Sequence, residues 1–189
     1  MKICLIFLSL ISLNVIAKPA GLKYKAFVYG RHYTSHKSPV SKQDSVATNA
    51  AETICPDDLL TFAQTLIGTP YHFASSNPNY GFDCSGFVGY VFRNFDISVP
   101  RSSGDFANVG QKVKLEDAKP GDIILFTGTQ KHSRKIGHVG IIVCNADHEI
   151  RFIHSTSGKE HGVTITTMDN YYRHRFVRIV RMFKQNDLV

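Results

Sequence analysis

The chain has 189 residues, of which 43% are hydrophobic, and its formal net charge is +7. This length favours one domain, and the hydrophobic content supports a core that folds without disulfides. The basic charge favours polyanionic surfaces such as a bacterial envelope. The sequence contains no basic helix and no aromatic-basic platform, so nucleic acid is not an expected partner.

The first residues, MKICLIFLSLISLNVIA, have the pattern of a secretory signal peptide. A short basic start precedes an apolar run over residues 3–13, and small or modest residues lead to a cleavage site after Ala17. A membrane anchor would need roughly 20 apolar residues, and Asn14 and Lys18 interrupt the run too early. We therefore expect export to the periplasm or the extracellular space by residues 1–17, without stable membrane insertion.

Residues 18–53 are rich in Lys, Ser, Thr and Asn and show no clear periodicity. They read as an extended arm or linker, with one short strand at Lys25–Tyr29. Residues 54–189 then form the catalytic domain in this interpretation.

Two amphipathic helices are predicted at the start of this domain. Pro56 and the acidic residues after it suit the first turn of a helix, which Gly68 ends. Asp83 is a good N-cap for a second helix and places Cys84 in its first turn. The apolar residues of the second helix that recur at helical spacing are Phe87, Val88, Val91, Phe92 and Phe95.

The chain beyond Pro100 is predicted to form short strands. The segments rich in β-forming residues are DIILF, HVGIIV, IRFIHS, VTITTM and FVRIVRM, separated by turn-like segments. Their spacing predicts a meandering, mostly antiparallel sheet of five to six strands. Helices followed by strands indicate an α+β fold.

Cys84 has the setting of a reactive cysteine. Without Cys4 of the leader, three cysteines remain, and this odd number leaves at least one thiol free or paired with another chain. A helix N-terminus lowers a thiol pKa, so Cys84 is expected to react below pH 8 and faster than Cys55 or Cys144, which could pair with each other. Its first-turn amides also point where an oxyanion would form. The charge of Asp83 partly opposes the thiolate.

A nucleophilic cysteine needs a base, and two of the nine histidines fit by register. The segment CNADHE between the strands of His138 and His154 predicts a hairpin turn. A turn centred on Ala146 places the two histidines directly opposite each other, whereas one centred on Asp147 makes them diagonal neighbours on the same face. Either register allows a hydrogen bond between them. His138 would then be the base, and His154 the group that orients it.

The motifs around Cys84, His138 and His154 together resemble those of the NlpC family of bacterial cell-wall cysteine peptidases. The matching motifs are GTPYHF, GFDCSGFVGYVF, VPRSS, AKPGDIILF, GHVGIIV and RFIHS, spread over residues 56–182. The resemblance implies a papain-like fold without a cofactor. It also implies hydrolysis of peptide bonds in peptidoglycan stem peptides or muropeptide fragments, often between D-γ-glutamate and a diamino acid such as meso-diaminopimelate. A monomer is favoured.

The same resemblance implies roles for individual residues. Cys84 matches the nucleophile, His138 the base and His154 the third polar residue. Tyr71 matches a tyrosine that lines the site. The motif residues near the substrate groove are matched by Asp83, Ser85 and Arg101.

Several alternatives remain open from the sequence. Cys84, His138 and His154 could instead ligate zinc, although no CxxC or HxxxH spacing supports a closed site. The chain could be an inactive wall-binding module, or an amidase or acyltransferase with the same three residues. The segment TGTQKHSRKIG before His138 is long and basic, and it could form a lid, recognise an acidic group or be a solvated loop.

Overall fold

The computed structural model describes residues 55–130, 132–146 and 149–183, which belong to a unit that spans residues 48–189. The expected signal peptide, the arm and its strand at Lys25–Tyr29 lie outside the described residues.

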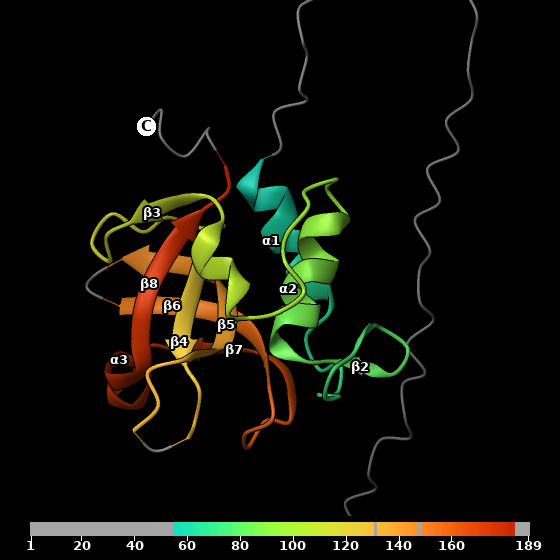
Figure 1. Ribbon diagram of the computed structural model, residues 1–189. Helices are drawn as coiled ribbons and strands as arrows, with labels where there is room; N and C mark the ends of the chain where they lie inside the picture. The colour runs from blue at the N-terminus through green and yellow to red at the C-terminus, as the bar shows by residue number, and fades with distance from the viewer. Residues whose placement is uncertain (1–54, 131, 147–148, 184–189) are drawn as a thin grey trace, which may run out of the picture. The chain divides into compact units, whose positions relative to one another are not determined.

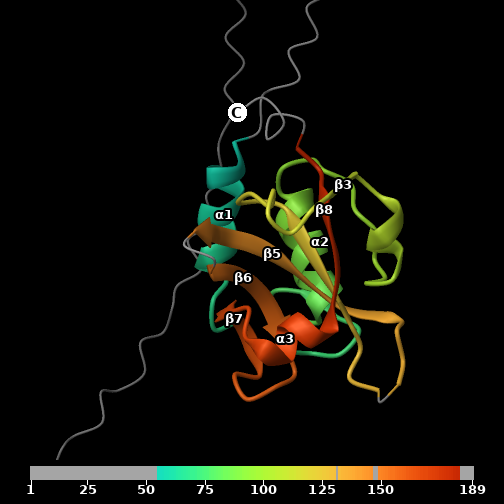
Figure 2. The same cartoon turned by 90° about the vertical axis from the view of Figure 1, so that its left-hand side faces the viewer.

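The domain consists of a six-stranded antiparallel sheet with two helices, α1 (Pro56–Thr65) and α2 (Cys84–Arg93), against one face (Figures 1 and 2). This architecture confirms the α+β fold with its helices before the sheet. The sheet contains β3 (Gln111–Val113), β4 (Ile123–Thr127), β5 (Ile136–Ala146), β6 (Glu149–Thr156), β7 (Gly162–Thr167) and β8 (Phe176–Arg181). The other elements are β1 (Ser76–Asn77), β2 (Gly81–Phe82), the 3-10 helix η1 (Asp105–Asn108) and α3 (Asn170–Arg175).

Both helices begin where the sequence predicts. Pro56 occupies the first helical position of α1, and Gly68, with φ +87°, follows the helix at the point where the chain turns away. Only glycine adopts that backbone conformation readily. The side chain of Asp83 caps α2. The apolar face of α2 is fully buried and includes Phe87, Val88, Val91 and Phe92.

The sheet is a meander only in part. β4, β5, β6 and β7 are neighbours in chain order, but β8 does not follow β7. It lies instead between β3 and β4, so the prediction of a simple meander is wrong for the last strand. The reason is the burial of β4 along its whole length. The backbone groups of a buried strand need partners on both sides, and β8 supplies the second set.

A β-bulge interrupts the pairing of β5 with β6. The strands pair as Ala146↔Glu149 near the turn and as Ile141↔Ile153 further along, and Val143 is the extra residue between the two registers. A bulge of this kind shifts the pairing by one residue and bends the strand.

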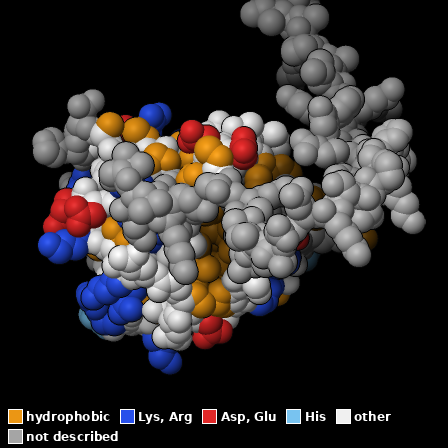
Figure 3. All heavy atoms as spheres, turned by 90° about the horizontal axis from the view of Figure 1, so that it is seen from above, with side chains coloured by type: hydrophobic (Ala, Val, Ile, Leu, Met, Phe, Trp, Pro, Cys, Tyr) orange, Lys and Arg blue, Asp and Glu red, His pale blue; other side chains and the backbone are white. Residues whose placement is uncertain are grey.

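The sheet separates two apolar clusters. One lies between the sheet and the helices and includes Phe82, Phe92 and Ile141. The other covers the opposite face and includes Phe126 and Phe152, with Tyr172 of α3 packed against it. The face drawn in Figure 3 carries hydrophobic side chains near its centre and charged side chains toward its rim.

A buried ion pair joins β8 to the start of β4. The guanidinium of Arg181 donates to both carboxylate oxygens of Asp122, with Nε–Oδ1 and Nη2–Oδ2 distances of 2.8 Å. Asp122 is fully buried and Arg181 is 7% exposed. Asp122 Oδ2 also accepts from the backbone N–H of Lys119. The pair therefore fixes three segments of the chain at one end of the sheet.

Among the described residues, no helix has both the length and the apolar character needed to cross a membrane.

Candidate active site

Cys84 begins α2 and is held in place by the cap before it. Asp83 Oδ1 accepts from the backbone N–H of Gly86 at 2.6 Å, which satisfies an otherwise unpaired donor of the first turn. Gly86 is required here because a Cβ at this position would collide with the carbonyl oxygen of Ser75. Cys84 itself stays partly exposed. The local sequence thus presents the thiol at the open end of a buried helix.

The pKa of the Cys84 thiol lies above its ordinary value, contrary to the sequence-based expectation. Burial is the largest cause, and the neighbouring carboxylate of Asp83 is the second. Hydrogen bonds from the backbone N–H groups of Val139, Ser85 and Cys84 itself act in the opposite direction but do not outweigh them. Cys84 is therefore a protonated thiol at neutral pH, and alkylation well below pH 8 is no longer expected. The contact with Val139 places the sulfur beside β5, next to the position of His138.

The predicted hydrogen bond between the two histidines is present. His138 Nε2 and His154 Nδ1 are 2.7 Å apart. Their register is the diagonal one, since a Cβ added to Gly140 would lie 3.2 Å from the Cβ of His154. The directly opposed register centred on Ala146 is wrong, because the strands pair as Ile141↔Ile153 near the histidines.

The bulge at Val143 is what brings the histidines to one face. The pairing Ala146↔Glu149, continued without a bulge, would put His138 and His154 on opposite faces, because a one-residue shift exchanges the faces of a strand. The extra residue restores the even spacing.

A third polar group extends the histidine pair. His154 Nε2 lies 2.9 Å from the hydroxyl oxygen of Thr166 on β7. If His138 Nδ1 is to accept a proton, Nε2 must carry its hydrogen and donate to His154 Nδ1. His154 Nε2–H then donates to Thr166. A hydroxyl that accepts at this position therefore favours the tautomer that a base needs, and the sequence reasoning missed it because Thr166 has no motif of its own.

Both imidazoles are neutral at rest. Burial lowers the pKa of His138 well below its ordinary value, and the charges of His154 and Arg175 add to this effect. Burial and Arg175 lower the pKa of His154 to about 3. The site at neutral pH thus holds a thiol and two uncharged imidazoles rather than an ion pair.

These shifts predict a broad pH profile for kcat/KM. The acid limb reports protonation of His138, whose lowered pKa moves this limb below pH 6.5. The alkaline limb reports loss of the Cys84 proton, whose raised pKa moves it above pH 9. Initial rates on a muropeptide between pH 4 and 10.5 would check this, with the limbs treated as properties of the pair. An acid limb above pH 6.5 would contradict it.

Replacing Thr166 with valine tests the last hydrogen bond in the chain from His138 through His154 to Thr166. A buried donor that loses its partner costs about 1–3 kcal/mol, so kcat is expected to fall roughly ten- to hundredfold, with KM little changed. Thr166→Ser keeps the hydroxyl and should restore most of the rate. An unchanged melting temperature excludes a loss of folding. Equal activity of the valine and serine variants would show that the hydroxyl does not position His154.

The predicted groove residues gather beside Cys84. Arg101 donates to Asp83 at 2.6 Å and 3.0 Å through its two terminal nitrogens, and to Ser85 Oγ at 2.9 Å. The hydroxyl of Tyr71 lies close enough that burial and the charges of Cys84 and Asp83 raise its pKa. All four groove residues named from the sequence are therefore near the thiol.

A hollow of about 560 Å³ opens beside this group, lined by Asp83, Ser85 and Arg101 together with Phe73 and Asp105.

Two further residues of the site were not found from the sequence. Tyr172 of α3 packs edge-on against His154, with ring centroids 5.7 Å apart, and in a tilted arrangement against His138, with ring centroids 6.3 Å apart. Burial raises its pKa to about 12. Arg175 stacks near Tyr172 and acts on both histidines by its charge. A six-residue helix between two strands offers too little periodicity to be recognised beforehand.

Cys55, Cys84 and Cys144 are free thiols, so the open pairing of Cys55 with Cys144 is not formed. In the described part of the chain, no group of three or more His, Cys, Asp or Glu side chains is arranged to hold a metal ion.

Curated relatives share much of this chain. A γ-DL-glutamyl hydrolase of Bacillus subtilis is 38% identical over 63% of the chain, and 27% of its own length is matched. A γ-D-glutamyl-L-lysine dipeptidyl-peptidase of the same species is 29% identical over 92% of the chain, and 54% of its length is matched. A probable NlpC endopeptidase of Escherichia coli is 35% identical over 58% of the chain and 66% of its own length. The chain thus spans about a quarter to a half of the first two relatives.

Solved structures share the fold. An NlpC/P60 family protein from Bacillus cereus superposes with a TM-score of 0.61 at 29% identity, over 69% of this chain and 41% of that one. The NlpC/p60 domain of the peptidoglycan hydrolase SagA gives 0.55 at 25% identity, over 68% of this chain and all of that one. The NlpC/P60 family model matches residues 68–181, a range that contains the thiol, both histidines and Thr166, and the chain therefore belongs to the NlpC/P60 family.

Proposed function

We propose that the protein is an exported cysteine endopeptidase that hydrolyses peptide bonds in peptidoglycan stem peptides, at the bond between D-γ-glutamate and a diamino acid. One observation carries this proposal. A thiol at the start of a buried helix lies beside the strand of an imidazole, which is aligned by a second imidazole 2.7 Å away. Relatives named as γ-glutamyl hydrolases and endopeptidases support the choice of bond and substrate.

The catalytic cycle starts from the neutral pair. As the Cys84 sulfur attacks the scissile carbonyl, its proton passes to Nδ1 of His138. His154 accepts from Nε2–H of His138 and stabilises the imidazolium that forms. The first-turn N–H groups of α2 and the Tyr71 hydroxyl donate to the oxyanion. The N–H donors are fixed in the backbone of α2 before substrate arrives.

The second half of the cycle releases the products. The imidazolium of His138 donates its proton to the departing amine, and the carbon–nitrogen bond breaks to leave an acyl-enzyme. A water molecule then attacks the thioester carbonyl, with His138 as its base, and the thiol is regenerated with the new carboxylic acid. Neither step calls for a cofactor.

The groove on the Cys84 side positions the acyl part of the substrate. Arg101 neutralises Asp83 through two hydrogen bonds. This ion pair holds the carboxylate in the orientation that caps α2. Ser85 and the free edge of the Arg101 guanidinium face the hollow of about 560 Å³ and offer polar contacts to a stem peptide.

The test is digestion of defined muropeptides by the purified protein, with product masses as the readout. Wild-type protein should cut between D-γ-glutamate and the diamino acid. Cys84→Ala should lose this activity, and Cys144→Ala, which changes another free thiol, should keep it. Cleavage at the glycan–peptide amide would identify an amidase. Binding without cleavage by the wild-type protein would identify an inactive wall-binding module.

Export is the remaining part of the proposal. The leader over residues 1–17 and the formal net charge of +7 support delivery to an anionic cell envelope.

A further inference from the structure

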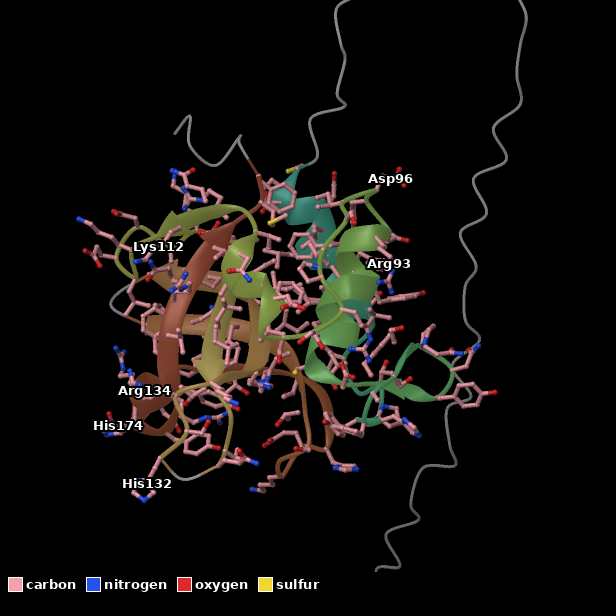
Figure 4. All side chains as sticks on the ribbon, viewed as in Figure 1. Arg93, Asp96, Lys112, His132, Arg134 and His174 are labelled. Carbon is pink, nitrogen blue, oxygen red and sulfur yellow. The ribbon has the colours of Figure 1, made fainter. Side chains whose placement is uncertain are left out.

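A second hollow, of about 330 Å³, lies between the β4–β5 loop and α3. Its residues from the loop include Gln130, His132 and Arg134, and those from α3 include Tyr171, His174 and Arg175. In Figure 4, His132, Arg134 and His174 lie at one end of the domain, the end at which Figures 1 and 2 show the loop, α3 and the start of α2. The hollow is separate from the one lined by Asp83 and Arg101.

The side chains that line the hollow include two cations, Arg134 and Arg175. No Asp or Glu is among the residues that line it. Arg134 is exposed, and within the described residues it forms no ion pair with a carboxylate. The basic segment noted in the sequence therefore places at least one guanidinium where a ligand can reach it.

Arg175 lines the hollow, and its guanidinium is held in place by hydrogen bonds. Its Nε and Nη2 donate to the carbonyl oxygen of Thr127 at 3.1 Å and 2.7 Å, and its Nη1 donates to the Tyr171 hydroxyl at 2.6 Å. The guanidinium also lies 4.7 Å from the centroid of the Tyr171 ring. Arginine has five N–H donors, so these three bonds leave two for a ligand. A guanidinium held in this way loses little freedom on binding a planar anion such as a carboxylate.

The hollow adjoins the candidate base rather than the thiol. Thr127, which Arg175 holds, pairs with Ile136 across β4 and β5, and the preceding pair is Phe126↔His138. The base of the loop is closed by the tight approach of Gly128 to Gly137, where a Cβ would lie 2.7 Å from the Gly128 Cα. The hollow is therefore built onto the strand that carries His138.

The position of the hollow beside the strand of His138 indicates which part of the substrate would contact it. In the proposed reaction His138 donates a proton to the departing amine, so the departing residue must lie on the His138 side. The acyl part lies on the other side, toward Ser85 and Arg101. A cationic hollow beyond His138 thus faces side-chain groups of the residue that leaves.

We propose that this hollow binds a carboxylate of the departing residue and makes the enzyme selective for acidic stem peptides. The proposal rests on the proposed function and specifies its substrate. Diaminopimelate carries a side-chain carboxylate that lysine lacks, and otherwise the two residues present the same amine to the scissile bond. A carboxylate between Arg134 and Arg175 would form charge-assisted hydrogen bonds in a site whose described lining contains no carboxylate.

The experiment compares kcat/KM for three matched tripeptides that end in diaminopimelate, its side-chain amide or lysine. We expect the wild-type protein to prefer the free carboxylate by about tenfold or more over both others. Arg134→Gln should lower kcat/KM for the diaminopimelate peptide about tenfold, through KM, and reduce the preference accordingly. Lys112→Gln removes an exposed charge from the distant β3 and should leave all three rates unchanged.

The outcomes separate this proposal from the one on which it rests. Equal cleavage of the three peptides by the wild-type protein would overturn the carboxylate site but leave the peptidase activity intact. An equal fall for all three peptides in Arg134→Gln would also overturn it, since loss of selectivity is the expected effect. Cleavage of none of the peptides would instead contradict the proposed function. Repetition in 0.5 M salt should weaken the preference, because an exposed charge is screened.

Discussion

His138→Ala is expected to reduce kcat/KM by at least about 1,000-fold, because it removes the group that takes the thiol proton in the proposed mechanism. The size of the loss follows from the raised pKa of Cys84. A thiol with a lowered pKa would retain thiolate without a base, whereas this one is protonated at neutral pH. Steady-state rates on a muropeptide would measure the loss.

A matched variant separates chemistry from folding. His154→Gln keeps a polar side chain on β6 but loses the imidazole that His138 contacts at 2.7 Å. We expect the kcat/KM of His154→Gln to lie between that of the wild-type protein and that of His138→Ala. Circular dichroism and melting temperature should show that both variants fold. A His138→Ala rate within tenfold of the wild type would contradict the assignment of this residue as the base.

Asp122→Ala is expected to destabilise the fold by about 3–5 kcal/mol, because it leaves the buried guanidinium of Arg181 without its carboxylate. Both nitrogen–oxygen distances in this pair are 2.8 Å, and Asp122 is fully buried. The variant also removes the acceptor of the Lys119 backbone N–H. Urea unfolding at pH 7 would measure the difference in free energy.

The surface pair Glu149–Arg151 provides the control. Its nitrogen–oxygen distance is 3.7 Å, and both side chains are about half exposed. Glu149→Ala should change the free energy of unfolding by about 0–1 kcal/mol. Equal effects of the two substitutions would show that burial of the Asp122–Arg181 pair does not determine its contribution.

The local parts of the site could be predicted from the sequence because neighbouring residues determine them. The cap by Asp83 and the placement of Cys84 in the first turn depend only on residues within one turn of α2. The approach of His138 to His154 was predicted from two hairpin registers that both keep them on one face. The turn itself has a third register, and the bulge at Val143 that compensates for it was not predicted.

The remaining parts depend on tertiary structure. The pKa of Cys84 rises rather than falls because burial by residues distant in sequence outweighs the helix N-terminus. Thr166 becomes part of the site only through the pairing His154↔Thr164, which turns it toward His154 from two residues along β7. The place of β8 beside β4 follows from the burial of β4, which no local pattern reveals.

The extra residue in β5 determines which changes of chain length this site can tolerate. Val143 is half buried, so another β-branched residue should be accepted there. Its deletion would make Ile142↔Phe152 and Cys144↔Arg151 consecutive pairs, so the strand would lose its bulge and His138 would stay on the face of His154. A one-residue insertion between His138 and Val143 would instead turn His138 to the other face of the sheet, unless a second bulge forms. Among variants of this protein, the loss of one residue between the two histidines should therefore be better tolerated than the gain of one.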